Sequence, residues 1–199
     1  RSTASDGSDQ RVNPPHAPPA RPSSAPLPRA PARPSIGLLD VVVGVSDLKL
    51  SARADERLVT YALGSCLGLV IHDPVARVTG LLHVMLPDST IDPAKAARNP
   101  AMFVDTGVPA LFKASYAMGA RKERMIVKVA GGAHAGATEA GDSFQIGKRN
   151  VLALRKLLWK NNVILHAHDV GGHQTSRTLY VDVATGLVRV RSNGRDAEL

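Results

Sequence analysis

The chain has 199 residues, of which 44% are hydrophobic and 21% are charged, a balance typical of a globular protein with one domain rather than two. The single cysteine excludes an intramolecular disulfide and a structural zinc site of several thiolates, and a free thiol suits a reducing cytosol. The net charge is +8, but the basic residues are scattered, aromatics make up only 4%, and no apolar run could span a bilayer, so we expect a cytoplasmic protein that neither binds nucleic acid nor inserts into a membrane.

The first segment of the chain differs in composition from the rest. Residues 1–36 consist largely of Pro, Ala, Ser and Arg, with almost nothing to bury. Such a segment cannot offset the entropy cost of ordering, so we expect a disordered N-terminal tail. The globular pattern then begins, which predicts a single domain over residues 37–199.

The N-terminal half of this domain reads mainly as strands. The Val-rich segment 40–50 predicts one strand, and residues 58–63 predict a second. Two further apolar runs, 66–73 and 79–86, are separated by a turn around Pro74, which predicts a β-hairpin.

The rest of the chain alternates helices and strands. Segment 103–120 predicts a helix with Pro109 in its first turn, and 146–162 predicts an amphipathic helix. The expected buried face of the second helix is formed by Val151, Leu152, Leu154, Leu158 and Trp159. Strands are expected at 125–130 (ending at Gly131-Gly132) and 163–170, and a hairpin at 178–192 that turns at Thr185-Gly186. Together these elements predict an α/β (α+β) layered sandwich of mostly antiparallel strands with about two long helices.

The only cysteine, Cys66, lies in the stretch TYALGSC, where a thiol nucleophile is one interpretation. If the hairpin pairs around Pro74, His83 lies across from Cys66 or diagonal to it, close enough to act as a base. Thr60 carries a hydroxyl that could orient the imidazole, and backbone N–H groups at Gly64 and Ser65 could face a developing oxyanion. The residues alone leave the alternative of a buried, inert cysteine and an ordinary core histidine open.

A second cluster of polar residues suggests a metal site as another alternative. His166 and His168 alternate in the predicted strand 163–170 and share a face, with His173 close behind. Histidines at a strand edge or in a loop are also common without a metal, and we expect none here.

Several ordered motifs together resemble the CheD family of chemoreceptor glutamine deamidases. They are TYALGSCLGLVIHDP, GLLHVMLPDS, FVDTGVPALF, KVAGGAH, IGKRN and DVGGHQTSR followed by TLYVDVATGLVRVR. The resemblance covers about residues 40–192. The sequence departs from the family pattern at His134, where the family usually has an apolar residue, and at Ser176, where it usually has Gly.

The resemblance implies an enzyme with a catalytic Thr, Cys and His, which correspond to Thr60, Cys66 and His83. The implied reaction is hydrolysis of receptor glutamine side chains to glutamate and ammonia, with no cofactor and no metal. The implied partners are the cytoplasmic helices of chemoreceptors and, in bacteria that have one, a CheC-type phosphatase. The alternative is a non-catalytic chemotaxis adaptor that binds a CheC-type phosphatase or receptors.

Overall fold

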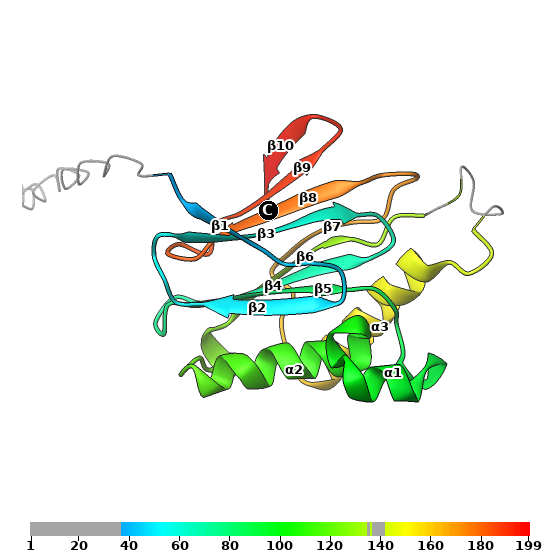
Figure 1. Ribbon diagram of the computed structural model, residues 1–199, viewed down its shortest axis with the longest axis horizontal. Coiled ribbons are helices and arrows are strands. Elements are labelled where there is room, and N and C mark those ends of the chain that lie inside the picture. Colours follow the sequence, from blue (N-terminus) through cyan, green and yellow to red (C-terminus); the bar gives the residue numbers. More distant parts are fainter. Residues whose placement is uncertain (1–36, 135, 137–141) are drawn as a thin grey trace, which may run out of the picture. The chain divides into compact units, whose positions relative to one another are not determined.

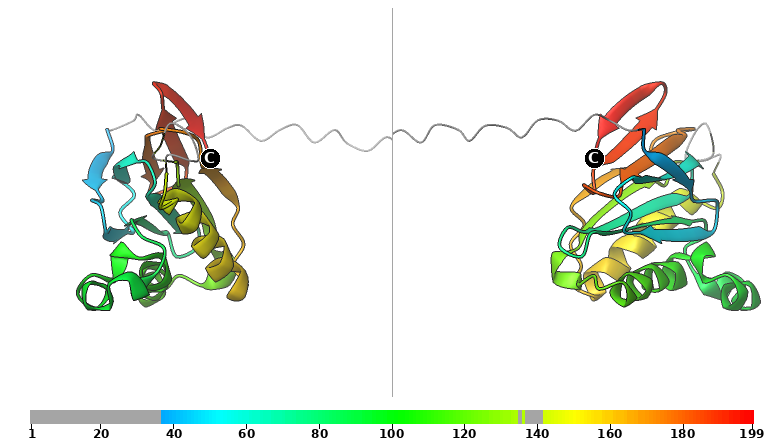
Figure 2. Two further views of the ribbon diagram at one scale, coloured as in Figure 1. Left: turned by 90° about the vertical axis from the view of Figure 1, so that its right-hand side faces the viewer. Right: turned by 60° about the vertical axis from the view of Figure 1, so that its left-hand side comes forward.

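The computed structural model describes residues 37–134, 136 and 142–199, so the predicted disordered tail lies outside the described residues. Two five-stranded sheets and a layer of helices are stacked on one another (Figure 1). The helices cover only one face of the second sheet, and its other face packs against the first sheet, as the turned views in Figure 2 also show. This three-layer arrangement confirms the predicted layered α+β sandwich.

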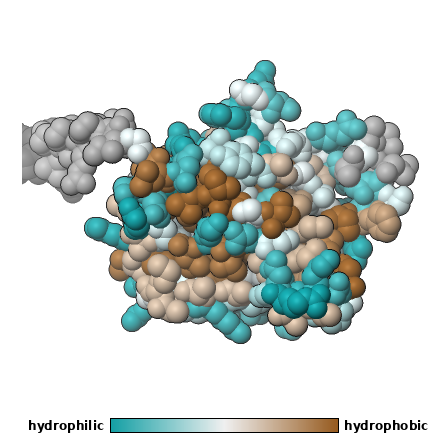
Figure 3. All heavy atoms as spheres, in the orientation of Figure 1, coloured by the Kyte–Doolittle hydropathy of each residue, from teal (hydrophilic) through white to brown (hydrophobic). Residues whose placement is uncertain are grey.

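The first sheet has the strand order β1-β3-β8-β9-β10. Its strands are β1 (Leu39–Val42), β3 (Glu56–Leu63), β8 (Arg177–Asp182), β9 (Val188–Ser192) and β10 (Arg195–Glu198). The β1–β3 pair is parallel and the other pairs are antiparallel. β10 is an edge strand whose residues are all exposed, and Figure 3 shows a hydrophilic surface there, whereas the surface over β1 is hydrophobic. Charged side chains on an edge strand oppose pairing with another chain.

The second sheet has the order β2-β5-β4-β6-β7. Its strands are β2 (Asp47–Ser51), β5 (Val78–Val84), β4 (Leu67–Asp73), β6 (Ile126–Gly131) and β7 (Ala167–Val170). The β6–β7 pair is parallel and the other pairs are antiparallel. β4 lies at the centre, between β5 and β6, and every residue of β4 and β5 is buried.

The helical layer contains α1 (Pro93–Arg98), α2 (Val104–Ala117) and α3 (Ile146–Lys160), with 3₁₀ turns at Ser89–Ile91, Pro100–Met102 and Lys122–Arg124. Because side chains alternate along a strand, β4 and β5 contribute to two cores. Leu69 and Leu82 pack in the core between the second sheet and the helices, while Val70 and Leu81 pack between the two sheets. The β4–β5 hairpin is therefore covered on both faces, and its inner face is where a buried polar group must find partners.

The prediction of a single strand over 40–50 was wrong. The segment forms β1 and β2, which belong to different sheets. Ser46 between them has a φ of 58°, in the left-handed region, which breaks the extended run and turns the chain from one sheet to the other.

The predicted helices exist, but two details differ. Pro109 lies inside α2 rather than in its first turn. Leu152 and Trp159, predicted to be buried, are 59% and 80% exposed on α3. The buried face of α3 is completed instead by Gly147 and Asn150, which the apolar pattern did not include.

The last strands are shorter and more numerous than predicted. Only the second half of 163–170 forms a strand, β7, because residues 163–166 form no regular ladder. The closing hairpin is confirmed as β8 and β9 with its turn at Thr185-Gly186, and β10 was missed because its sequence, RDAE, lacks an apolar alternation.

Candidate active site

The stretch TYALGSC runs from the end of β3 through a turn into β4. The pairing of β3 with β8 shifts register between Thr60 and Leu63, and Ala62 within this bulge has a φ of 56°. A bulge re-aims the side chains next to it. Residues Gly64, Ser65 and Cys66 then form the turn, and β4 begins at Leu67.

The hydroxyl of Thr60 links the two sheets through His83. Thr60 Oγ1 donates to the carbonyl of Val43 at 2.7 Å and lies 2.7 Å from His83 Nδ1. The hydroxyl has only one proton, which the carbonyl takes, so Oγ1 must accept from an Nδ1–H. This network fixes the neutral tautomer of His83 with its proton on Nδ1, and it leaves Nε2 as a base with a free lone pair.

Cys66 and His83 lie at the same end of the hairpin, in a diagonal arrangement. His83 is the register partner of Gly68, two residues after Cys66. Cys66 packs against the core between the sheets, the layer that His83 also faces because it alternates with Leu82 and Val84. His83 Nε2 is buried and has no hydrogen-bond partner within the described residues. The prediction that both residues lie at the same end of the hairpin is confirmed, and of the two registers that the sequence left open the diagonal one holds.

Burial controls the protonation of both groups. It lowers the pKa of His83 to about 4, and the side chain is only 1% exposed. Burial raises the pKa of the Cys66 thiol, while the backbone N–H of Cys66 itself acts in the opposite direction. At neutral pH the resting pair is thus a neutral thiol and a neutral imidazole. The thiol loses its proton only as its sulfur attacks an electrophile.

The predicted oxyanion donors differ in availability. The N–H of Gly64 already donates to the carbonyl of Ala62 at 3.0 Å, so it is occupied. The N–H groups of Ser65 and Cys66 donate to no other residue that the structure describes. Oxyanion sites use consecutive backbone donors of this kind.

Supports for this turn come from residues that the sequence analysis did not single out. The carbonyl of Cys66 accepts from Gly132 N–H, and a Cβ at Gly131 would lie only 2.1 Å from that carbonyl oxygen. Gly131 also has a φ of 117°. Both the lack of space for a Cβ and this backbone conformation therefore require glycine here. Asn150 on α3 donates from Nδ2 to the carbonyl of Ser65 at 3.0 Å. An asparagine in the buried stripe of an amphipathic helix was the sequence signal for it.

Two of the three histidines of the alternative metal site contact other residues. His166 Nδ1 accepts from the N–H of Val127 at 3.1 Å, and His173 stacks on His134 with ring centroids 5.2 Å apart. In residues 37–134, 136 and 142–199, no three His, Cys, Asp or Glu side chains are grouped to hold a metal ion. None of the described helices is long and apolar enough to cross a membrane.

Comparison with known proteins identifies the family. Residues 85–192 match the family model described as CheD chemotactic sensory transduction. The chain is 49% identical over 155 residues to the probable chemoreceptor glutamine deamidase CheD 1 of Syntrophus aciditrophicus, which covers 78% of this chain and 95% of that protein. This chain belongs to the CheD family.

Other CheD proteins match over the same extent. The probable chemoreceptor glutamine deamidases CheD of Solibacter usitatus and Thermococcus kodakarensis are 47% and 40% identical, over 80% of this chain and 92% and 98% of theirs. An alignment of this length in a chain of 199 residues cannot leave out residues 60–83, so the relationship extends across Thr60, Cys66 and His83. The resemblance inferred from the motifs is thus confirmed at the level of the family.

Proposed function

We propose that this protein is a protein-glutamine deamidase that converts glutamine side chains of chemoreceptors to glutamate, with Cys66 as nucleophile and His83 as base. The observation that carries the proposal is the chain of hydrogen bonds from Val43 through Thr60 to His83, which leaves Nε2 unprotonated at the end of the hairpin that also carries the only thiol. The relatives are named as probable chemoreceptor glutamine deamidases, which supports the substrate class.

In the first half of the proposed reaction, Cys66 Sγ attacks the side-chain carbonyl carbon of the glutamine while His83 Nε2 takes the thiol proton. The carbonyl oxygen becomes an oxyanion, which the N–H groups of Ser65 and Cys66 stabilise. The tetrahedral species collapses as the C–N bond breaks, and the proton on Nε2 passes to the leaving nitrogen. The products of this half are ammonia and a thioester.

In the second half, water attacks the thioester carbonyl and Nε2 takes one of its protons. The C–S bond breaks, the thiolate recovers the proton from Nε2, and glutamate leaves. The same donors serve both tetrahedral species, so the cycle needs no metal or organic cofactor in this proposal. Thr60 acts as a positioning residue, because it holds the ring and its tautomer through Nδ1 and does not reach the reacting atoms.

The test is incubation of the full chain with the cytoplasmic fragment of a chemoreceptor, measured by ammonia release and by the mass of receptor peptides. We expect Gln-to-Glu conversion with the wild type and none with Cys66→Ala, a loss of about 10⁴-fold or more. Because Cys66 is the only thiol, iodoacetamide should add one adduct and abolish activity in proportion to labelling. Conversion by Cys66→Ala at the wild-type rate would overturn the proposal.

A cytoplasmic site of action is part of the same proposal, since a free thiol nucleophile requires a reducing compartment. Binding of a CheC-type phosphatase stays a prediction from the family. The adaptor alternative lacks a specific structural observation in its favour. Catalysis is favoured by a buried imidazole nitrogen that has no partner in the described chain and lies at the same end of the hairpin as the thiol.

A further inference from the structure

Asn150 is a fully buried amide that joins the two segments of the candidate site. It lies on α3, where its side chain is 0% exposed. Its Nδ2 donates to the carbonyl of Ser65 at 3.0 Å and to the carbonyl of Met85 at 2.9 Å. Ser65 directly precedes Cys66, and Met85 follows His83 by two residues. One NH₂ group therefore bridges the nucleophile segment and the base segment.

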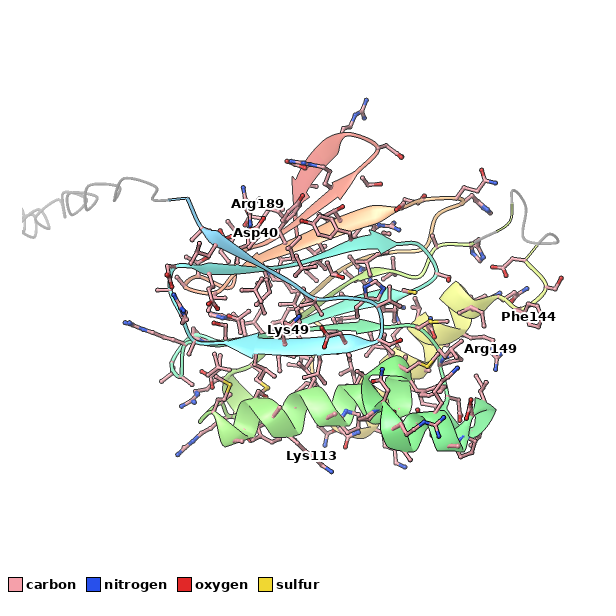
Figure 4. All side chains as sticks on the ribbon, viewed as in Figure 1. Asp40, Lys49, Lys113, Phe144, Arg149 and Arg189 are labelled. Carbon is pink, nitrogen blue, oxygen red and sulfur yellow. The ribbon has the colours of Figure 1, made fainter. Side chains whose placement is uncertain are left out.

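Asn150 is buried although the residue before it on α3, Arg149, is exposed. Arg149 projects outward from the N-terminal end of α3, near Phe144, as Figure 4 shows. Asn150 Oδ1 has no partner among the described residues and is also buried. Both groups that Asn150 contacts are carbonyls, so only an NH₂ can face them, and the orientation of the amide is determined.

Each of the three carbonyls of the turn accepts a hydrogen bond, and the bond to the Ser65 carbonyl comes from Asn150. The carbonyl of Gly64 accepts from Ala133 N–H at 2.8 Å, and that of Cys66 accepts from Gly132 N–H at 2.8 Å. The Ser65 carbonyl has no backbone donor in the described part of the chain and depends on Asn150. Asn150 thus controls the one peptide plane of the turn that the backbone leaves undetermined.

The orientation of this plane decides where the N–H of Cys66 points. In a trans peptide the C=O of Ser65 and the N–H of Cys66 point in opposite directions, and the described chain has no cis peptide bond. Because the C=O points at Asn150 on α3, the N–H points away from that helix, and the Cys66 side chain packs on the core between the sheets, on the other face of the second sheet.

We propose that Asn150 is a positioning residue that builds the oxyanion site, by holding the Ser65 carbonyl so that the N–H of Cys66 faces the reacting carbonyl oxygen. This rests on the proposed deamidase function and adds a residue from a distant helix to it. Asn150 does not touch substrate. It acts through the peptide that joins Ser65 to the nucleophile, and its second bond, to Met85, keeps that peptide in a fixed position relative to His83.

Two assays of the same variants separate this role from general support of the fold. Deamidation of a receptor fragment passes through an oxyanion, whereas alkylation of Cys66 by iodoacetamide displaces iodide and forms none. For Asn150→Ala we expect kcat for deamidation to fall about 100-fold with little change in KM. The alkylation rate should fall by less than about tenfold and its pH profile should move only slightly to higher pH, because the thiol and His83 stay in place and only the effect of the Cys66 N–H on the thiol pKa is lost.

The matched control is Asn161→Ala. Asn161 ends the same helix and also donates from Nδ2 to a backbone carbonyl, that of Leu157 at 2.8 Å, but far from Cys66 in the fold. It should keep wild-type values in both assays. Asn150→Ser retains one donor and should lose less activity than Asn150→Ala, and it replaces that variant in the comparison if circular dichroism shows that the alanine protein does not fold.

The outcomes are distinct. Ammonia release by the wild type together with wild-type kcat in Asn150→Ala, or in Asn150→Ser where it replaces an unfolded alanine variant, overturns the role of Asn150 and leaves the proposed function intact. An equal fall in deamidation and alkylation also overturns it, because the side chain would then support the whole turn. Absence of ammonia release by the wild type overturns the proposed function, and the inference falls with it.

Discussion

The β4–β5 hairpin carries the same polar unit at both ends, and only one end faces a thiol. At the open end, His83 Nδ1 lies 2.7 Å from Thr60 Oγ1, which donates to a carbonyl, that of Val43. At the turn end, His72 Nδ1 lies 2.8 Å from Thr79 Oγ1, which donates to the carbonyl of Val183 at 3.0 Å. Both imidazoles are buried, at 1% and 2% exposed, and burial lowers the pKa of both.

The two ends differ in what faces the other ring nitrogen. At the turn end, Gly186 packs on the His72 ring so closely that a Cβ there would lie 2.9 Å from Nε2. Nearby, Asp73 accepts from Arg124 and three backbone N–H groups, which lowers its pKa to about 2 despite its burial. At the open end, His83 Nε2 and Asn150 Oδ1 have no partners in the described chain.

A histidine–threonine pair is therefore a structural device for joining two packed sheets, and it is no catalytic signature by itself. A buried polar atom without a partner costs stability and calls for an explanation. In this hairpin the inaccessible ring nitrogen without a partner in the described chain, His83 Nε2, lies at the end that contains Cys66, whereas at the other end Gly186 packs on the His72 ring. The comparison predicts that matched substitutions at the two ends will separate activity from stability.

The largest expected effect comes from replacing each imidazole by an amide. Asparagine can donate from its side chain much as Nδ1–H does, but it has no basic nitrogen at the position of Nε2. His83→Asn should lose about 10⁴-fold or more in kcat, whereas His72→Asn should stay within about twofold of the wild type. The measurement is ammonia release per folded molecule, with folding checked by circular dichroism.

The result that would break the comparison is a similar loss of activity in both histidine variants. It would mean that His83 matters through sheet packing, as His72 does, and not through a free Nε2. Activity retained in His83→Asn would exclude His83 as the base.

A smaller effect is expected for the two hydroxyls. Valine has the shape of threonine without its hydroxyl, so each substitution leaves a carbonyl and an Nδ1–H unpaired and should lower the free energy of unfolding by about 1–3 kcal/mol. Thr60→Val should in addition lower kcat about 10- to 100-fold, because the tautomer and angle of His83 are no longer held. Thr79→Val should leave kcat unchanged.

Urea denaturation and steady-state kinetics on the same samples test this pair. Equal losses of stability with unequal losses of activity are the expected pattern. If Thr60→Val keeps the wild-type kcat, Thr60 stabilises the sheets only, and its role as a positioning residue is wrong.

Sequence patterns predicted the fold where apolar runs, helical periodicity or turn residues mark an element. The β4–β5 hairpin follows from two continuous apolar runs and the turn between them, helices α2 and α3 from helical periodicity, and the closing hairpin from alternation around a turn. The split of segment 40–50 did not, because a continuous run of valines gives no sign of which sheet each part joins. The exposure of Trp159 was missed for a similar reason, since periodicity cannot tell a buried apolar side chain from one left on the surface.

The candidate site was predicted in part. Local spacing was enough to bring Cys66 and His83 to one end of a hairpin. The contacts that fix their chemistry come from further away: Val43 determines the tautomer through Thr60, and Asn150 reaches the turn from a helix 85 residues along the chain. Such contacts depend on how the layers stack, which spacing along the chain does not contain.

The smallest expected effect is that of pH on the activity. The pKa of His83 is about 4 in the folded protein, so its Nε2 should remain unprotonated at pH 5, and kcat/KM should change less than about twofold between pH 7 and pH 5. An imidazole with a pKa of about 6.5 would lose more than about nine-tenths of its basic form over that range. His72→Asn should leave the acidic limb where it is, because in the proposed mechanism only His83 takes part in the reaction.

Stability must be followed in parallel, because it also depends on these histidines. Both have folded-state pKa values below those of the unfolded chain, so between about pH 6.5 and the lowered values the unfolded chain binds more protons. The free energy of unfolding should therefore fall as the pH falls through this window, and rates are compared only where circular dichroism shows folded protein. A fall in kcat/KM with a midpoint near pH 6.5 in folded protein would show that Nε2 is as basic as in a free imidazole. Burial at the open end would then not lower the pKa of His83.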